Sequence, residues 1–246
     1  MIEPAAYSAL DSKRFGIRVF RGRVDNVATV AELLQFARSA DLDLLIVRSP
    51  VEALAVAQAL ERAGAILTDT LVYYRGPTSK FAPSPAPSCD VRLGQEADRT
   101  ALQAIARASF AGFFGHYHAD PRLDPAAATE GYVQWASSVL ADASSVVLVS
   151  ETDGQLSGFL TATKLDAKTW EILLNGVAPE FQRRGIYAAL FSEIGCRARA
   201  QGASQVLVST QLANLAPQKV WTRAGLELDH ALYTFHWWQD TDSRNL

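Results

Sequence analysis

Residues 177–187 have the sequence V-A-P-E-F-Q-R-R-G-I-Y and follow an apolar segment of strand length, residues 172–177. The proline ends this predicted strand, and apolar residues at helical spacing over residues 187–199 predict a helix. The backbone N–H groups around Gly185 are therefore expected to be the unpaired donors of a helix N-terminus, which attract anions, and two arginines precede them. The sequence predicts a site for a phosphorylated ligand at this turn.

The turn resembles the signature Q/R-x-x-G-x-G/A of the GNAT superfamily, the acyl-CoA-dependent N-acyltransferases. Gln182 and Gly185 match the signature, whereas Tyr187 stands where the family has a small residue. The resemblance implies that the main chain of this turn holds the pyrophosphate of acetyl-CoA or another short acyl-CoA, and an ordinary strand–turn–helix crossover is the alternative. The residues implied for cofactor binding at the turn are Val177, Gln182, Arg183, Arg184, Gly185, Ile186 and Tyr187.

A second segment follows the alternating residues 205–211, which predict a strand. It resembles the GNAT pattern N-x-x-A-x-x-x-Y-x-x-x-G-F, in which the asparagine contacts the pantetheine arm and the tyrosine often reprotonates the CoA thiolate. Asn214 occupies the first position, but Trp221 occupies that of the tyrosine. Both are expected beside the cofactor. Because an indole N–H is no acid near neutral pH, another group or water has to supply the proton, and the alternative for Trp221 is packing alone.

Length and composition set the bounds of this interpretation. The chain has 246 residues, 49% of them hydrophobic, and a formal net charge of −3, so it can hold one large or two small domains. The sequence contains no block of basic residues that would indicate a nucleic-acid partner. No apolar run approaches the ~20 residues of a membrane span, and the first residues lack the apolar core of a signal peptide. Cys89 and Cys196 lack the spacing of a disulfide framework. We therefore expect a cytoplasmic protein without nucleic-acid or membrane partners.

The Pro- and Ser-rich segment 77–89 predicts a linker between two modules. Residues 1–76 predict a small α/β module without a recognisable catalytic motif. This module is either a packing or dimerisation domain or forms one wall of an acceptor pocket. Residues 90–246 have the element order of a GNAT core, and the resemblance implies an α/β (α+β) fold with a mixed, strongly twisted sheet that splays at Val177. Residues 153 and 154 are expected to close a hairpin, and two strands, 226–230 and 232–238, to end the chain. The added module is compatible with a homodimer.

Residues 110–123, F-A-G-F-F-G-H-Y-H-A-D-P-R-L, lie where GNAT enzymes usually build acceptor specificity. His116, His118 and Asp120 are a weak metal signal, and acyl transfer from a thioester needs no metal, so we expect none. We expect an acceptor loop that binds a polar substrate; a surface loop with aromatic anchors is the alternative. The expected substrate-binding residues are Tyr117, His118, Asp120, Arg122 and, from the last strand, His236.

This loop, with Tyr132, Trp135 and residues 209–214 and 233–238, resembles the sugar-nucleotide branch of the family typified by dTDP-fucosamine acetyltransferase, which carries a separate N-terminal α/β domain. The resemblance implies an acceptor that is a dTDP-linked amino sugar used for surface polysaccharide. Two alternatives stay open. The chain is either a GNAT enzyme for another amine, such as an antibiotic, a polyamine or a protein N-terminus, or a CoA-binding module without catalysis.

Direct transfer requires that an ammonium substrate loses a proton and that the thiolate gains one. Glu171 is a candidate base acting through water, and an exposed strand-end carboxylate is the alternative. A main-chain N–H near Val177 is expected to meet the oxyanion. The other candidate acids and bases, for which simple hydrogen bonding in place is the alternative, are His118, His230, His236 and Tyr233.

Overall fold

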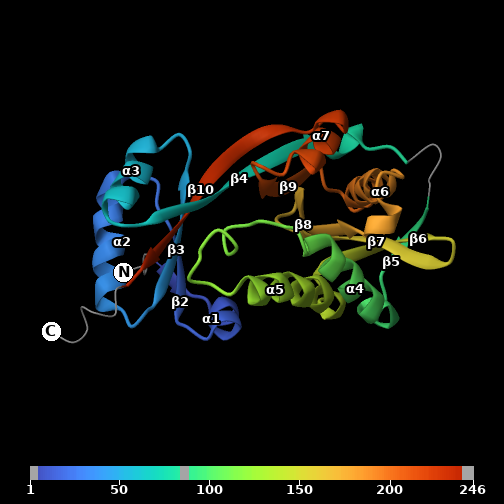
Figure 1. Ribbon diagram of the computed structural model, residues 1–246. Coiled ribbons are helices and arrows are strands. Elements are labelled where there is room, and N and C mark those ends of the chain that lie inside the picture. Colours follow the sequence, from blue (N-terminus) through green and yellow to red (C-terminus); the bar gives the residue numbers. More distant parts are fainter. Residues whose placement is uncertain (1–4, 84–88, 240–246) are drawn as a thin grey trace. The chain divides into compact units, whose positions relative to one another are not determined.

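The computed structural model describes residues 5–83 and 89–239 (Figure 1). These residues form two compact units. Unit 1 contains residues 5–72, 114–128 and 230–239, and unit 2 contains the described residues of 73–113 together with 129–229. The predicted division into 1–76, 77–89 and 90–246 differs from these units, because two segments far along the chain pack with the N-terminal residues.

Unit 1 is built on a sheet in the order β1-β2-β3-β10-β4, in which β2 and β3 are parallel and β10 is antiparallel to β3. Its elements are β1 (Ala5–Tyr7), α1 (Ala9–Phe15), β2 (Val19–Arg23), α2 (Val27–Ser39), β3 (Leu44–Pro50), α3 (Leu54–Arg62), the first part of β4 (Ile66–Pro77) and most of β10 (Glu227–Trp238). One apolar core joins α2 and α3 to this sheet through buried residues such as Leu33, Leu60, Val47 and Phe235. The strand β1 and the helix α1 are not among the predicted elements.

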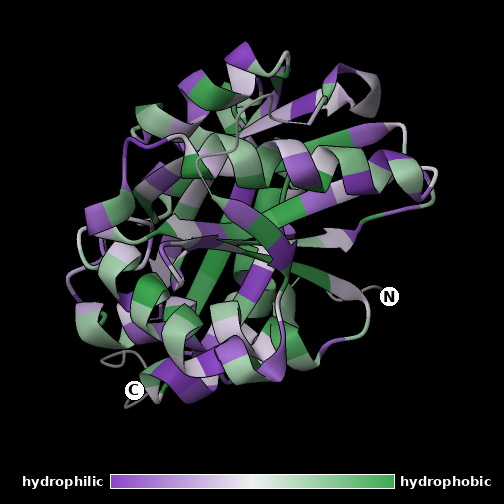
Figure 2. Cartoon of the chain, turned by 90° about the vertical axis from the view of Figure 1, so that its right-hand side faces the viewer, coloured by the Kyte–Doolittle hydropathy of each residue, from purple (hydrophilic) through white to green (hydrophobic). Residues whose placement is uncertain are grey.

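Unit 2 contains a mixed sheet in the order β4-β9-β8-β7-β6-β5. Its remaining elements are β5 (Asp90–Leu93), α4 (Arg99–Phe110), α5 (Pro125–Ser138, whose first residues belong to unit 1), β6 (Ser145–Thr152), β7 (Gln155–Lys164), β8 (Thr169–Val177), α6 (Ile186–Ala200), β9 (Gln205–Gln211) and α7 (Leu215–Arg223). The helices carry hydrophilic and hydrophobic residues side by side, as expected for helices with one buried face (Figure 2). None of the described helices is both long and apolar enough to cross a membrane.

The hairpin between β6 and β7 forms as predicted. Asp153 and Gly154 have φ angles of 52° and 75°, which is the left-handed pair that a two-residue turn between twisted strands requires. Aspartate tolerates this conformation better than most residues, and glycine adopts it freely. The D-G dipeptide therefore explains the turn.

The sheet of unit 2 splays along β8, as the resemblance implied, but the divergence begins before Val177. The parallel pairing of β8 with β9 runs from Thr169–Gln205 to Ile172–Val208, whereas β8 continues to Val177. A register shift at Thr161 in the β7–β8 pairing accompanies this divergence, and the Thr161 hydroxyl bonds to the backbone of Leu174. The divergence therefore begins after Ile172 rather than at Val177.

Two other predictions of the fold are wrong. The chain ends in one continuous strand, β10, and not in two, because Ala231 at the expected break offers no turn chemistry. The described part of the expected linker is folded: Thr78 donates a hydrogen bond to the Ala203 carbonyl, and the buried Phe81 packs on Phe191. Residues 84–88 of that linker lie outside the described residues.

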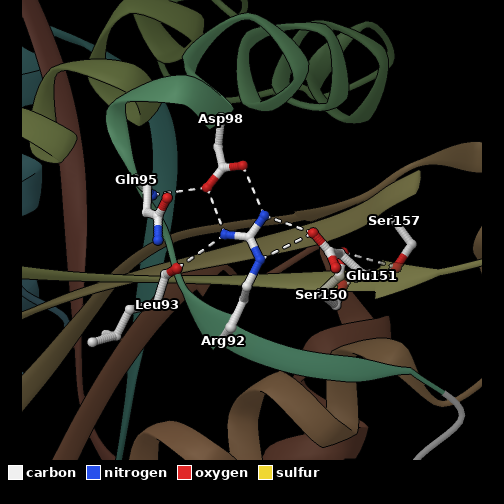
Figure 3. Close-up of polar contacts among 7 residues, drawn as sticks. All are labelled: Arg92, Leu93, Gln95, Asp98, Ser150, Glu151 and Ser157. Atoms are coloured by element: carbon white, nitrogen blue, oxygen red, sulfur yellow. Dashed lines mark hydrogen bonds and ion pairs between the residues drawn. The ribbon is translucent and has the colours of Figure 1, made fainter. Parts of the chain in front are cut away.

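An arginine-centred network fixes the start of unit 2. Figure 3 shows the Arg92 guanidinium between Asp98, to which it donates hydrogen bonds of 2.7 and 2.8 Å, and Glu151, to which the shorter bond is 2.6 Å. The Arg92 hydrogen bond holds the pKa of Asp98 below its ordinary value, and Asp98 also accepts the Gln95 backbone N–H. This network ties β5 and the segment before α4 to β6, which is a structural role.

Candidate active site

The turn between β8 and α6 has an unusual backbone. A short 3-10 helix, Pro179–Phe181, follows β8, and the buried Phe181 ring anchors it. Arg183 and Gly185 then have φ angles of 63° and 81°. A left-handed arginine is uncommon, because its Cβ is crowded there, and such residues concentrate at functional sites. The two left-handed residues redirect the exposed residues 182–185 into the start of α6.

The N-terminus of α6 is open to a ligand. Gly185 is the N-cap and has no side chain to accept a hydrogen bond from the first turn of the helix, and within residues 5–83 and 89–239 no other side chain does so. Its unpaired N–H groups therefore remain available, and Arg183 and Arg184 are exposed next to them. This donor set fits the pyrophosphate of an acyl-CoA, and the assignment of the turn residues to the cofactor stays a prediction.

The end of β8 is tied to its surroundings through Val177. The Val177 carbonyl accepts hydrogen bonds from the Ser109 hydroxyl at 3.3 Å and from the Gln182 side-chain amide at 3.2 Å. Gln182 therefore braces the turn against the strand. The role of a main-chain N–H near Val177 toward an oxyanion stays a prediction.

Trp221 does more than fill space. Its indole N–H donates a 2.6 Å hydrogen bond to the Tyr187 hydroxyl, and its ring, which is 1% exposed, lies against Tyr74. Burial raises the pKa of Tyr187, and the Trp221 hydrogen bond opposes this only in part. The two residues that depart from the family signatures thus contact each other. Asn214, at the start of α7, donates to the Thr210 hydroxyl at 3.0 Å.

The candidate acids and bases lie in different settings. Glu171 is the third residue of β8 and is half-buried, with Thr163 and Leu207 as its strand partners, so it is not an exposed strand-end carboxylate. Tyr233 packs against the apolar core of unit 1, and His230 is half-buried in β10. Their catalytic roles stay predictions.

The segment 114–128 brings two histidines and a carboxylate into one hydrogen-bonded row in unit 1. The Nδ1 atom of His116 lies 2.9 Å from Nε2 of His236, whose Nδ1 lies 2.7 Å from the Asp120 carboxylate. The Trp238 indole donates to the same carboxylate at 2.8 Å. Burial would raise the pKa of Asp120, but hydrogen bonds from His236, Trp238 and the Arg122 backbone hold it below its ordinary value.

Three of the five predicted acceptor residues are buried, which differs from a loop that offers them directly to substrate. Asp120 and His236 are 1% and 0% exposed, and they satisfy each other. The Tyr117 hydroxyl donates to Asp11 at 2.7 Å and accepts a hydrogen bond from Arg21. Their polar groups reach partners within unit 1 and hold the loop in place.

The other two predicted acceptor residues keep contact with solvent. His118 is half-buried, accepts the Gly115 backbone N–H at 3.3 Å, and has a pKa lowered by burial. Arg122 is exposed and lies over the Trp238 ring at 5.4 Å. No group of three or more His, Cys, Asp or Glu side chains is placed to hold a metal ion in the described part of the chain.

Sequence reasoning missed Asp11, Arg14, Arg21 and Arg48 as parts of the polar interior of unit 1. Asp11 pairs with Arg21 at 2.6 Å and with Arg14 at 3.5 Å. Asp11 and Arg14 lie three residues apart in α1, whereas Arg21 comes from β2 and Arg48 from β3. No spacing along the chain links these three segments, so only the folded arrangement reveals the group.

Solved structures share this fold. A functionally unknown conserved protein from Staphylococcus epidermidis ATCC 12228 superposes with a TM-score of 0.69 at 16% identity, over 98% of this chain and 93% of that one. A GCN5-related N-acetyltransferase from Kribbella flavida gives a TM-score of 0.67 at 14% identity, over 96% and 87%. At these identities the likeness concerns the fold, and it confirms the predicted α/β class.

Sequence comparison identifies the family. The spore coat polysaccharide biosynthesis protein SpsD of Bacillus subtilis (strain 168) is 24% identical over 205 residues, which are 83% of this chain and 70% of SpsD. The profile of the acetyltransferase (GNAT) family matches residues 102–226, about half of the chain, including the turn before α6. The chain therefore belongs to the acetyltransferase (GNAT) family.

Proposed function

We propose that this protein transfers an acetyl or other short acyl group from an acyl-CoA directly to the primary amine of a nucleotide-linked aminodeoxy sugar. The observation that carries the proposal is the open N-terminus of α6, at the end of a strand that has parted from its neighbour, in a GNAT chain. The similarity to a polysaccharide biosynthesis protein supports the choice of a sugar acceptor.

The acyl donor is held by the main chain of the turn. The N–H groups after Gly185 meet the pyrophosphate, and Arg183 and Arg184 add positive charge beside it. The thioester of the bound acyl-CoA supplies the activated carbonyl. The unpaired part of β8, which ends at Val177, offers backbone groups beside the pantetheine arm.

Two protons have to move during the transfer. The acceptor amine must be neutral to attack, and Glu171 or His118 removes the proton directly or through water. The departing thiolate gains a proton from water or from Tyr233 or His230. Trp221 cannot supply it, because its indole N–H is committed to Tyr187 and is not acidic near neutral pH.

The test is thiol release from acetyl-CoA with dTDP-linked amino sugars, polyamines and aminoglycosides at one enzyme concentration. The expected result is acceptor-dependent release with an amino sugar and background release with the other amines. Release with a polyamine or an aminoglycoside alone would replace the sugar by another amine. Tight CoA binding without release for any amine would favour a non-catalytic module.

A further inference from the structure

The sheet of unit 1 has two unlike faces. Side chains alternate along β10, and Phe235 and Trp237 enter the apolar core beneath α2 and α3. Thr234 and His236 therefore point to the opposite face. In the register of β10 with β3, Thr234 lies across from Arg48, so the two side chains are direct neighbours on that face. This second face, which we call the polar face, also holds the row of His116, His236 and Asp120.

Arg48 is a cation without a partner on this face. Its side chain is half-buried, and neither an ion pair nor a hydrogen bond joins its guanidinium to another described residue. Burial is the main reason that the pKa of the His116 imidazole is lowered, and the nearby charge of Arg48 contributes with those of His236, Arg21 and Arg14. A half-buried guanidinium normally finds an acceptor, because its donors lose water on burial.

A buried polar group beside Arg48 also lacks a partner. The Thr234 hydroxyl is completely buried and has no hydrogen-bond partner among the described residues. Buried polar groups are nearly always satisfied, so an unsatisfied hydroxyl next to a guanidinium without a partner indicates a missing ligand.

The charge of the polar face selects the kind of ligand. Arg14, Arg21 and Arg48 face the carboxylates of Asp11 and Asp120; Asp11 pairs with two of the arginines, and Asp120 bonds to His236 and Trp238. Arg23, next to Arg48 in the β2–β3 register, adds a further cation. This excess of positive charge disfavours an ammonium group and favours an oxyanion.

We propose that the polar face of unit 1 binds a phosphate-type oxyanion through Arg48 and Thr234. Resting on the proposed function, the oxyanion is the diphosphate of the nucleotide-linked sugar. Arg48 supplies a forked pair of N–H donors, and the Thr234 hydroxyl donates from the neighbouring strand. Unit 1 then has a chemical role of its own, the binding of a nucleotide diphosphate.

The test is calorimetric titration with dTDP, inorganic pyrophosphate and thymidine, always with saturating CoA so that the turn before α6 is occupied. We expect dTDP and pyrophosphate to bind and thymidine not to bind. Arg48→Gln should weaken dTDP binding about tenfold or more, since it removes a charge-assisted donor pair. Arg62→Gln is the matched control, because Arg62 is exposed on α3, and it should bind dTDP like the wild type.

A second variant keeps the proposal testable if Arg48→Gln folds poorly. Thr234→Val keeps the shape of the side chain and removes a hydroxyl without a partner, so it should weaken dTDP binding without lowering the melting temperature. Binding of dTDP that is unaffected by both variants, or equal binding of thymidine, would overturn the proposal. If dTDP binds through Arg48 but no amino sugar is acylated, the oxyanion site stands and the proposed function fails.

Discussion

The turn before α6 and the polar face of unit 1 are both built for polar ligands, but by different means. At the turn the binding groups are main-chain N–H donors, and Arg183 and Gly185, two left-handed residues on either side of Arg184, set their direction. On the polar face the groups are side chains such as Arg48 and Thr234, which come from distant segments. Residues close together in the sequence encode the first kind of site. The second kind forms only when folding brings distant segments together.

The largest expected effect is on acyl-CoA binding, and it distinguishes a substitution at the turn before α6 from one at the other end of this helix. Gly185→Asp should abolish acyl-CoA binding in calorimetry, because it puts a carboxylate at the anion site and strains a residue with a φ of 81°. Gly202→Asp is the matched control: Gly202 follows the other end of α6, has a φ of 86°, and has open space around a Cβ. Equal loss of binding in both variants would mean that strain alone, and not the anion site, is responsible.

The next effect tests whether the polar face holds unit 1 together. Asp120→Ala should lower the free energy of unfolding by about 3 kcal/mol, since it leaves His236 and Trp238 without their buried acceptor. Asp124→Ala, in the same segment, removes an exposed acceptor of the Ala126 N–H and should cost about 1 kcal/mol. Urea unfolding measures both, and equal losses would contradict the network.

The same carboxylate predicts a pH dependence. The pKa of Asp120 is lowered in the folded protein, so its contribution is fully present above the unfolded value of about 3.9 and is lost as the pH falls through the folded value. The stability difference between the wild type and Asp120→Asn should therefore shrink as the pH falls below about 4. A difference that stays constant across this range would show that Asp120 is not held ionised.

A smaller effect concerns the pair of residues that depart from the family signatures. Tyr187→Phe leaves the buried Trp221 indole without an acceptor and should cost about 1–3 kcal/mol of stability in urea unfolding. Tyr74→Phe is its control in the same aromatic cluster, because the Tyr74 hydroxyl makes only a 3.4 Å bond to Gln218. A larger loss for Tyr74→Phe would contradict the importance of the Trp221–Tyr187 bond.

The smallest expected effect is on stability and concerns the Arg92 network, which we expect to have no role in acyl-CoA binding. Arg92→Met should cost about 1 kcal/mol, because its ion pairs are partly exposed, and should leave acyl-CoA affinity unchanged. Arg107→Met breaks a single, more exposed pair with Glu130 and should cost less. A change in acyl-CoA affinity for Arg92→Met would connect this network to the site.

The sequence predicted most elements of the fold for local reasons. The D-G turn at Asp153 and Gly154 and the strand–turn–helix around Gly185 depend on backbone preferences that neighbouring residues encode. The predicted break of the final strand at Ala231 is wrong, because no residue with turn preference lies there. Helix α1 was missed because its seven residues are too few for a periodic pattern.

The candidate site residues also fall into those that local sequence predicts and those whose position depends on the fold. The turn residues were found because Gln182 and Gly185 keep a fixed spacing along the chain. The sequence predicted Tyr117, Asp120 and His236 as substrate-binding residues, but their burial follows from packing that joins α1, β2 and β10. No pattern of spacing encodes such a contact between distant segments, so their position was not predictable.

The most direct test of the central claim follows an isotope-labelled acetyl group from acetyl-CoA by mass spectrometry in the presence of a dTDP-linked amino sugar. The account predicts that the label appears in an amide on the sugar amine, and that Gly185→Asp, which cannot hold the donor, abolishes the transfer. Label that remains in acetyl-CoA while the wild-type protein binds both compounds would contradict it.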